Sequence, residues 1–260
     1  MFKLLFLLVG ASLAGPVENV KLTTEDGLQL HALYQSAEDS QQTVLFLHML
    51  NRSAKDWEYL AQRVNRAGFN TLAMDLRSHG ENSGQGKPMA DLNYSDFRAM
   101  LGDVELAIAW LKKRGASNIS IVGASIGSSL ALLAAGGDPA IRNLVLLSPG
   151  VNYKGLELAG AMETYGERPV LIAVSSEDGY SAKSALVLDS EALGKHHVAI
   201  YDNAGHGTKM LNRSPKLEPL IQSWLLQTWG VSHGERNTDS LIQTGDVTPQ
   251  ETSGKKFGEE

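Results

Sequence analysis

Strand-like and helix-like segments alternate along most of the chain, and this alternation restricts the fold more than any other feature of the sequence. Residues 43–49 form a continuous apolar run, typical of a strand covered on both faces, and further strand-like segments occupy residues 69–75, 119–122, 141–149, 168–176 and 196–202. Helix-like segments separate or follow them at residues 55–67, 94–114, 126–135, 182–193 and 214–229. Strands joined through helices pair in parallel, so the pattern predicts an α/β fold with one mostly parallel central sheet and helices on both faces.

A hairpin precedes the alternating part. Residues 17–25 and 28–35 are short alternating runs on either side of Asp26 and Gly27, a dipeptide that favours a tight turn. The chain has 260 residues, of which 43% are hydrophobic, and this is enough for one sizeable α/β domain. No internal repeat and no long linker divides it, so we expect a single domain over residues 15–230.

The beginning of the sequence has the pattern of a leader. Lys3 is followed by an apolar run over residues 4–9 and by a small-x-small cleavage pattern that ends at Ala14. We interpret residues 1–14 as a secretory signal peptide and expect export to the periplasm or the cell exterior. The apolar run is much shorter than the ~20 residues of a membrane-spanning helix, so no stable membrane anchor is expected after cleavage.

Composition excludes several classes of protein. The net charge is −6 without a concentrated run of Lys or Arg, so nothing supports nucleic-acid binding. The chain has no cysteine, which excludes disulfides and thiolate chemistry. Metal-ligand spacing and the phosphate-loop motif are both missing, and we expect no metal and no cofactor. Residues 231–260 are polar and rich in Gly, Ser and Thr, so a disordered tail is predicted there.

A serine lies where the apolar run at residues 119–122 changes into a helix-like segment. Gly123-Ala124-Ser125-Ile126-Gly127 fits G-x-S-x-G, a strained turn that lifts the serine hydroxyl above a sheet. The two glycines allow close approach of neighbouring backbone, and the following helix N-terminus favours a developing anion. The pentapeptide alone is a weak signal, and an ordinary helix cap is the alternative for Ser125.

Candidates for a catalytic acid and base follow later strands. Asp178 comes after the strand at residues 168–176, and His206 lies between two glycines after the last strand. Carboxyl ends of parallel strands meet at one edge of a sheet, so these side chains are expected near Ser125. The chain order is nucleophile, acid, base. Glu177 and Asp202 are alternatives for the acid, and a surface role is the alternative for His206.

These residues and two further segments resemble the α/β-hydrolase superfamily over residues 17–230. LFLHMLNRSAKDW at residues 45–57 is similar to the family's strand and His-Gly segment, and DLRSHGENSG at residues 75–84 is similar to its D-x-R-G-H-G-x-S loop. The resemblance implies the α/β-hydrolase fold and a serine esterase. His-Met-Leu sequences occur in the dienelactone-hydrolase-like branch, whose well-known members use a cysteine nucleophile that this chain lacks.

The resemblance also implies an oxyanion hole made by backbone N–H groups. Ile126, directly after the nucleophile, is one donor, and Leu50 is the other. Met49 replaces the family's usual glycine, which leaves Met49 as an alternative to Leu50. His48 is expected to pack beneath this loop. A hydrogen-bonded loop beside the site is expected to contain Asp75, Arg77 and His79.

The family usually sets its specificity with a cap after the sixth strand. Here residues 149–167 are short and leave room for one small helix at most, which predicts an open site for small or exposed esters. Candidate walls of the substrate site are Tyr153, Met162, Tyr165 and Tyr180. We therefore predict a serine hydrolase that cleaves a small-molecule carboxylic ester through an acyl-enzyme. An acyltransferase with the same triad and a non-catalytic binding protein on this fold are the alternatives.

Overall fold

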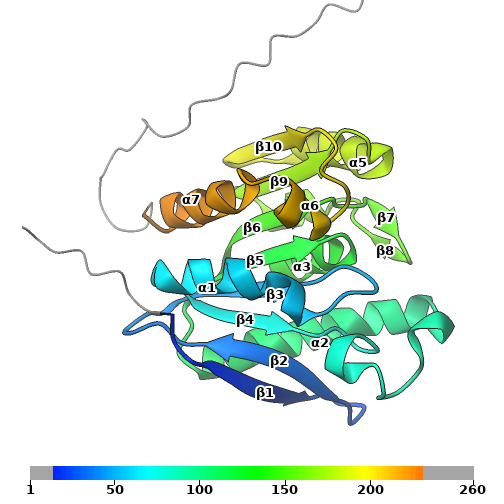
Figure 1. Cartoon of the computed structure of the whole chain (residues 1–260). Helices are drawn as coiled ribbons and strands as arrows, with labels where there is room; N and C mark the ends of the chain where they lie inside the picture. Colours follow the sequence, from blue (N-terminus) through cyan, green and yellow to red (C-terminus); the bar gives the residue numbers. More distant parts are fainter. Residues whose placement is uncertain (1–13, 231–260) are drawn as a thin grey trace, which may run out of the picture.

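The computed structural model describes residues 14–230 of the chain. The predicted signal peptide, apart from Ala14, and the predicted tail at residues 231–260 lie outside the described residues. The described part contains an eight-stranded sheet (Figure 1). In sheet order its strands are β1 (Val17–Thr23), β2 (Gln29–Gln35), β4 (Asn70–Met74), β3 (Gln42–Leu47), β5 (Asn118–Ala124), β6 (Ile141–Leu147), β9 (Val170–Ser175) and β10 (His196–Tyr201).

Pairing within this sheet agrees with the prediction of a mostly parallel sheet. Strand β2 is antiparallel to β1 and β4, and all other neighbouring pairs are parallel. The predicted hairpin at residues 17–35 is therefore confirmed as β1 and β2. The chain crosses from β4 on one side of β3 to β5 on the other side, so β3 and β5 form a topological switch point. Functional groups of open α/β sheets gather at the carboxyl ends of such strands.

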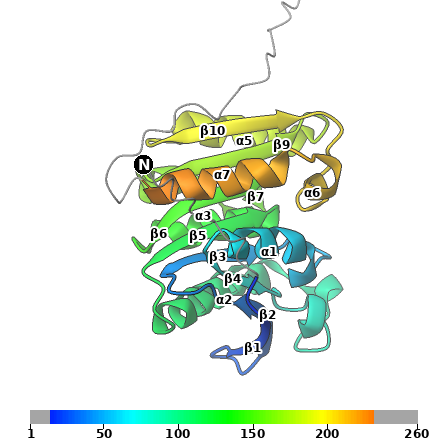
Figure 2. The same cartoon turned by 60° about the vertical axis from the view of Figure 1, so that its left-hand side comes forward.

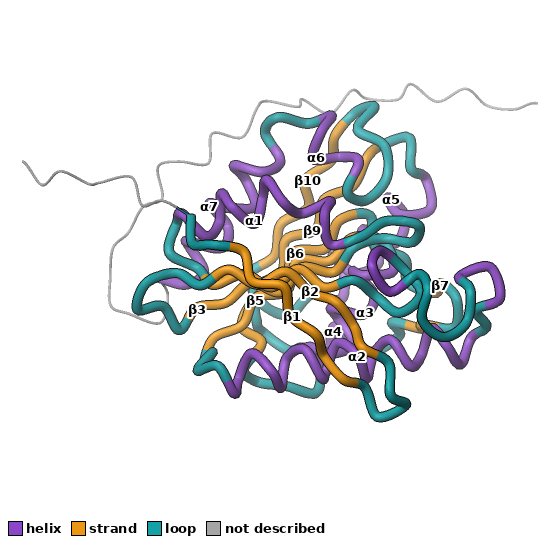
Figure 3. Tube along the Cα trace, turned by 60° about the horizontal axis from the view of Figure 1, so that its bottom comes forward, coloured by secondary structure: helices purple, strands orange, loops and turns teal. Residues whose placement is uncertain are grey.

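Helices cover both faces of the sheet (Figure 3). One face carries α1 (Glu58–Arg66), α6 (Lys209–Arg213) and α7 (Leu217–Gly230). The other face carries α2 (Tyr94–Lys113), α3 (Ile126–Gly136), α4 (Ala161–Tyr165) and α5 (Gly179–Glu191). Figure 2 shows α1 and α7 in front of the sheet. The fold expected from the sequence is confirmed.

Burial on both faces explains why the strands read as continuous apolar runs. Along β3, Val44 and Phe46 belong to the apolar cluster beneath α1 and α7, whereas Leu45 and Leu47 belong to the cluster beneath α2 and α3. Successive side chains of a strand point to opposite faces, so a strand covered on both faces is apolar at most of its positions.

The structure differs from the prediction in three local segments. The helix expected at residues 55–67 begins with a 3-10 turn, η1 (Ala54–Trp57), before α1. The helix expected at residues 214–229 is α7, and the separate short helix α6 precedes it. Between β6 and β9 a hairpin of β7 (Asn152–Tyr153) and β8 (Leu156–Glu157) precedes α4. Two-residue strands are too short to show an alternating pattern, so only the small helix was predictable there.

No helix within the described part of the chain has both the length and the apolar character that crossing a membrane requires.

Candidate active site

Ser125 lies in a strained turn between β5 and α3. Its φ of 54° and ψ of −117° are unusual for a residue with a side chain. A Cβ added to Gly123 would lie 2.3 Å from the carbonyl oxygen of Gly127, and a Cβ added to Gly127 would lie 2.3 Å from the carbonyl oxygen of Leu47. Both flanking glycines are therefore required by close backbone approach, as the motif predicts.

Hydrogen bonds hold this turn against β6. The Ser125 N–H donates to the Leu147 carbonyl at 2.8 Å. The Ser128 hydroxyl lies 2.8 Å from the Gly123 carbonyl oxygen and 3.0 Å from that of Leu147. The Ser125 side chain makes no capping bond to α3, so the helix-cap alternative is wrong. Its hydroxyl is left available for another role.

His206 and Asp178 are in direct contact at the ends of β10 and β9. The Nδ1 atom of His206 lies 2.5 Å from Oδ2 of Asp178. The imidazole is 42% exposed and the carboxylate 17%. Burial raises the pKa of Asp178, but hydrogen bonds from His206 and Ser181 outweigh this effect and lower it below the usual value. Asp178 is therefore ionised at neutral pH and can hold the imidazole with its proton on Nδ1.

The two alternative acids have other partners. Glu177 accepts hydrogen bonds from the backbone N–H groups of Asn203 and Gly205. Asp202 accepts one from the Ser176 hydroxyl at 2.7 Å. The structure thus brings Asp178, and neither of its alternatives, to His206. Within residues 14–230 no hydrogen bond joins the Ser125 hydroxyl to the imidazole, and such catalytic bonds often tighten only when substrate binds.

A buried histidine lies under the loop after β3. His48 is fully buried, its Nδ1 lies 2.7 Å from the Met49 carbonyl oxygen, and its Nε2 lies 2.9 Å from the Leu76 nitrogen. Burial lowers the pKa of His48 to about 4, so the ring is neutral, donates from Nδ1 and accepts at Nε2. In a trans peptide the N–H points opposite to the C=O, so the contact also fixes the direction of the Leu50 N–H.

A carboxylate that the sequence analysis missed joins this loop to the segment of His206. Asp56, only 9% exposed, forms an ion pair with Arg52 at 2.7 Å. It also accepts a hydrogen bond from the Thr208 hydroxyl, two residues after His206. In addition, the Gly207 N–H donates to the Ser148 hydroxyl at 2.9 Å. No local motif marks these residues, because each partner is far away along the chain.

The loop after β4 is hydrogen-bonded as expected. Buried Asp75 accepts from the backbone N–H groups of Ala54 at 2.7 Å and Glu81 at 3.0 Å, and its carboxylate lies 2.9 Å from Nδ1 of His31. It therefore fastens this loop to η1 and to the first hairpin. His79 is also buried, and its Nδ1 lies 2.9 Å from the Arg77 carbonyl oxygen.

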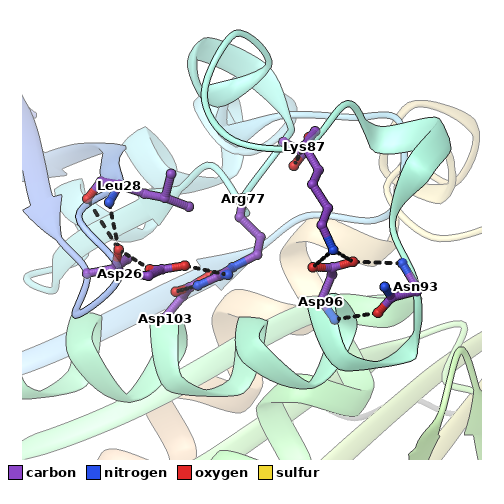
Figure 4. A network of polar contacts seen from close by, with 9 residues as sticks. Asp26, Leu28, Arg77, Lys87, Asn93, Asp96 and Asp103 are labelled. Atoms are coloured by element: carbon purple, nitrogen blue, oxygen red, sulfur yellow. Dashed lines mark hydrogen bonds and ion pairs between the residues drawn. The ribbon is translucent and has the colours of Figure 1, made fainter.

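Arg77 attaches the same loop to α2 (Figure 4). Its Nε and one terminal nitrogen each lie 2.6 Å from a different oxygen of Asp103, and its other terminal nitrogen lies 3.2 Å from Asp26. Lys87 contacts both oxygens of Asp96 at 2.9 Å, near the start of α2 (Figure 4). Both pairs join the segment between β4 and α2 to α2 itself, so they stabilise the position of this loop.

Two of the four candidate wall residues are in the core. Met162 and Tyr165 are each 1% exposed, and the Tyr165 hydroxyl donates to the Pro169 carbonyl at 2.7 Å. We therefore remove both from the candidate site, because α4 packs against α3 and α5 and buries both side chains in the core. Tyr153 is half-buried against the core, and Tyr180 is 49% exposed with its hydroxyl donating to the Asn152 carbonyl.

Among residues 14–230 no group of three or more His, Cys, Asp or Glu side chains is close enough to hold a metal ion.

The sheet order and the serine in the turn after β5 define the class of protein, an α/β hydrolase. The family model described as serine aminopeptidase, S33, matches residues 38–176, just over half of the chain. The chain belongs to this family.

The chain is also similar in sequence to a curated protein. A serine hydrolase-like protein of Dictyostelium discoideum is 25% identical over 199 residues, which cover 76% of this chain and 52% of that protein. The chain thus spans about half the length of this curated relative.

Two solved structures resemble the fold. A dienelactone hydrolase from Anabaena variabilis has a TM-score of 0.68 at 18% identity and covers 83% of this chain and 99% of its own. An esterase from Pyrococcus furiosus superimposes with a TM-score of 0.62 at 17% identity, and the match covers 82% of this chain and 91% of the esterase.

Proposed function

We propose that this α/β hydrolase is a serine hydrolase and cleaves carboxylic esters through a covalent acyl-enzyme, with Ser125 as nucleophile, His206 as base and Asp178 as orienting acid. The observation that carries the proposal is the contact of 2.5 Å between His206 Nδ1 and Asp178 Oδ2. With Nδ1 protonated and engaged, the other ring nitrogen is the one that can accept the serine proton.

The reaction has two steps. His206 Nε2 removes the hydroxyl proton as Ser125 Oγ attacks the ester carbonyl, and the alcohol leaves with that proton as the acyl-enzyme forms. Water then attacks the acyl group and gives a proton to the same nitrogen. That nitrogen returns the proton to Ser125 Oγ as the bond between this oxygen and the acyl carbon breaks, which releases the acid and restores Ser125. Throughout, the Asp178 carboxylate keeps the imidazole in the productive tautomer and stabilises its charged form.

Backbone N–H groups stabilise the oxyanion of each tetrahedral intermediate. Ile126 follows the nucleophile at the start of α3, where N–H groups have no helical acceptor. Leu50 is the second donor in this proposal, because the peptide that carries its N–H is fixed through His48. Met49 remains the alternative. Loss of one such donor typically costs about 3 kcal/mol of transition-state stabilisation.

The ester is favoured over the substrate that the family's name suggests. An aminopeptidase must bind the α-amino group of its substrate, usually with a carboxylate. Asp56, Glu177, Asp178 and Asp202, acids that lie on or contact the segments around His206, all accept hydrogen bonds from protein groups. The short segment between β6 and β9, a hairpin and α4, further supports small or exposed esters.

The first test is labelling with a fluorophosphonate probe together with turnover of p-nitrophenyl acetate. The wild-type protein should be labelled at Ser125, and Ser125→Ala and His206→Ala should abolish labelling and turnover. Asp178→Asn should lower turnover by about 10⁴-fold, because the imidazole then adopts the wrong tautomer. A folded wild-type protein that neither labels nor turns over would refute the esterase proposal and favour a non-catalytic binding protein.

Acyl transfer to an alcohol uses the same residues and differs only in the acceptor. Product analysis with and without a competing alcohol distinguishes the two reactions. An enzyme that forms the new ester in preference to the free acid is an acyltransferase.

Export remains a separate proposal that rests on the leader-like pattern at residues 1–14. Expression of the full chain in a bacterial host, followed by fractionation and N-terminal sequencing, tests it. We expect periplasmic or secreted protein that begins at Gly15, and an intact N-terminus in the cytoplasmic fraction would contradict it.

A further inference from the structure

The segment just before His206 is held by the end of β9. Three consecutive backbone N–H groups donate to side chains there: Asn203 to Glu177 at 2.9 Å, Ala204 to the Ser175 hydroxyl at 2.8 Å and Gly205 to Glu177 at 2.8 Å. The Ser175 hydroxyl in turn donates to Glu177. Each oxygen of the Glu177 carboxylate therefore binds a different N–H of the same turn.

The backbone of this turn is left-handed at two positions. Asn203 has a φ of 53° and Gly205 a φ of 81°. Asn and Gly adopt this region more readily than other residues, so the turn is accessible to the chain and its hydrogen bonds fix its place on β9. Glu177 accepts two of the three hydrogen bonds that the backbone N–H groups of residues 203–205 donate to side chains at the end of β9, although its residue is exposed.

The neighbouring carboxylate in the chain binds the ring. Asp178, next to Glu177, contacts Nδ1 of His206. Residues 175–178 thus hold both parts of the base: Ser175 and Glu177 bind the backbone that leads to His206, and Asp178 binds its imidazole. A shift of the turn relative to β9 would change the angle and distance of the contact between His206 and Asp178.

We infer that Glu177 is a positioning residue of the active site, which fixes the backbone before His206 so that the imidazole meets Asp178 and Ser125 in line. The expected effect of Glu177 on turnover rests on the proposed function, whereas its expected effect on the contact between His206 and Asp178 does not. The hydrogen bond from the Ser175 hydroxyl has the largest effect on Glu177, and the one from the Gly205 N–H comes second. Together they lower the pKa of Glu177 to about 2, so its carboxylate is ionised at any working pH.

Glu177→Ala is the main test. Displacement of a catalytic group by about 1 Å can cost about 100-fold in rate, so we expect kcat to fall between about 10-fold and 100-fold with KM changed less than about twofold. Glu177→Gln keeps one acceptor oxygen but presents an NH₂ group to the second N–H, so it should lie between wild type and Glu177→Ala.

The matched control is Asp202→Ala. Asp202 is an exposed carboxylate on the same turn, and it bonds the Ser176 hydroxyl but no backbone N–H of residues 203–205. This variant should keep the kcat of the wild type. Thermal unfolding of all variants checks that each is folded.

NMR provides the readouts that do not depend on turnover. The proton between His206 Nδ1 and Asp178 should give a low-field resonance in wild type and in Asp202→Ala, and Glu177→Ala should broaden or shift it. Amide exchange at Asn203 and Gly205 should accelerate in Glu177→Ala alone. Faster exchange with kcat and the resonance unchanged would overturn the inference, because Glu177 would then be structural only.

These readouts separate the two proposals. A wild-type protein without labelling or turnover refutes the esterase, whereas the resonance and the exchange rates still decide whether Glu177 positions His206. A labelled, active wild type with an unaffected Glu177→Ala variant refutes only the role of Glu177.

Discussion

The side chain of Met49 occupies the space beside the backbone of Gly207. A Cβ added at Gly207 would lie 2.5 Å from Sδ of Met49 and 3.5 Å from its Cβ. The residue that faces Met49 is Gly207, next to His206, and it has a φ of 58°. The loop after β3 and the turn of His206 therefore depend on each other's side-chain volume.

This contact predicts coupling between two substitutions. Gly207→Ala should lower turnover of p-nitrophenyl acetate by about 10-fold or more, since the added methyl group displaces the His206 turn, and left-handed backbone adds about 1–2 kcal/mol of strain. Met49→Ala in the same chain should recover part of the loss, because it removes the thioether. A double-mutant cycle measures the coupling, and strictly additive effects would contradict the contact.

Replacement of Gly127 by alanine should cost much more stability than the same replacement at Gly137, only ten residues away. Gly127→Ala should destabilise the protein by about 3 kcal/mol or prevent folding, because its Cβ would lie 2.3 Å from the Leu47 carbonyl oxygen. At Gly137 nothing lies within 4 Å of an added Cβ, and its φ of −83° suits alanine. Gly137→Ala should therefore leave stability unchanged within about 1 kcal/mol, or raise it. Urea unfolding compares the two variants.

The ion pair of Arg77 and Asp103 is expected to contribute strongly to the free energy of unfolding. Their side chains are 11% and 2% exposed. Asp103→Ala should cost about 3–5 kcal/mol, because it leaves the Arg77 charge mostly buried without its main partner. Lys87→Ala removes an ion pair whose lysine is 52% exposed and should cost less than about 1 kcal/mol. Equal losses in chemical denaturation would contradict this assignment.

His48 predicts loss of stability in mild acid. Its pKa is about 4 in the fold against an ordinary value of 6.5, so the unfolded chain takes up a proton first as pH falls. The stabilisation is complete above pH 6.5 and is lost as pH falls from 6.5 towards 4. At about 1.4 kcal/mol per pKa unit, this contribution is about 3 kcal/mol.

The measurement is the free energy of unfolding at several pH values. His48→Gln should lower stability at pH 7 but flatten its decline between pH 6.5 and 4. Buried His79, whose pKa is also lowered by burial, adds a decline of the same sign that remains in the variant. An unchanged slope in His48→Gln would refute the neutral buried histidine.

Much of the fold was predictable because it depends on local patterns. Strands buried on both faces are mostly apolar along their length, so β3, β5, β6 and β9 were recognisable as apolar segments of the sequence. The turn around Ser125 was visible because only glycine fits at positions 123 and 127. Ser125, Asp178 and His206 could be chosen as candidates because each directly follows a predicted strand.

The direction of individual side chains was decided only by the tertiary structure. Glu177 and Asp178 are adjacent in the chain, yet one binds the backbone of the turn and the other binds the imidazole. Met162 and Tyr165 had the composition of a substrate wall but are buried in the core. Asp56 gave no signal at all, because its partner Thr208 lies 152 residues away. The sequence by itself determined which strands and turns form, since those depend on neighbours along the chain. Which carboxylate meets which donor depends on distances between distant segments, and these exist only after the sheet has assembled.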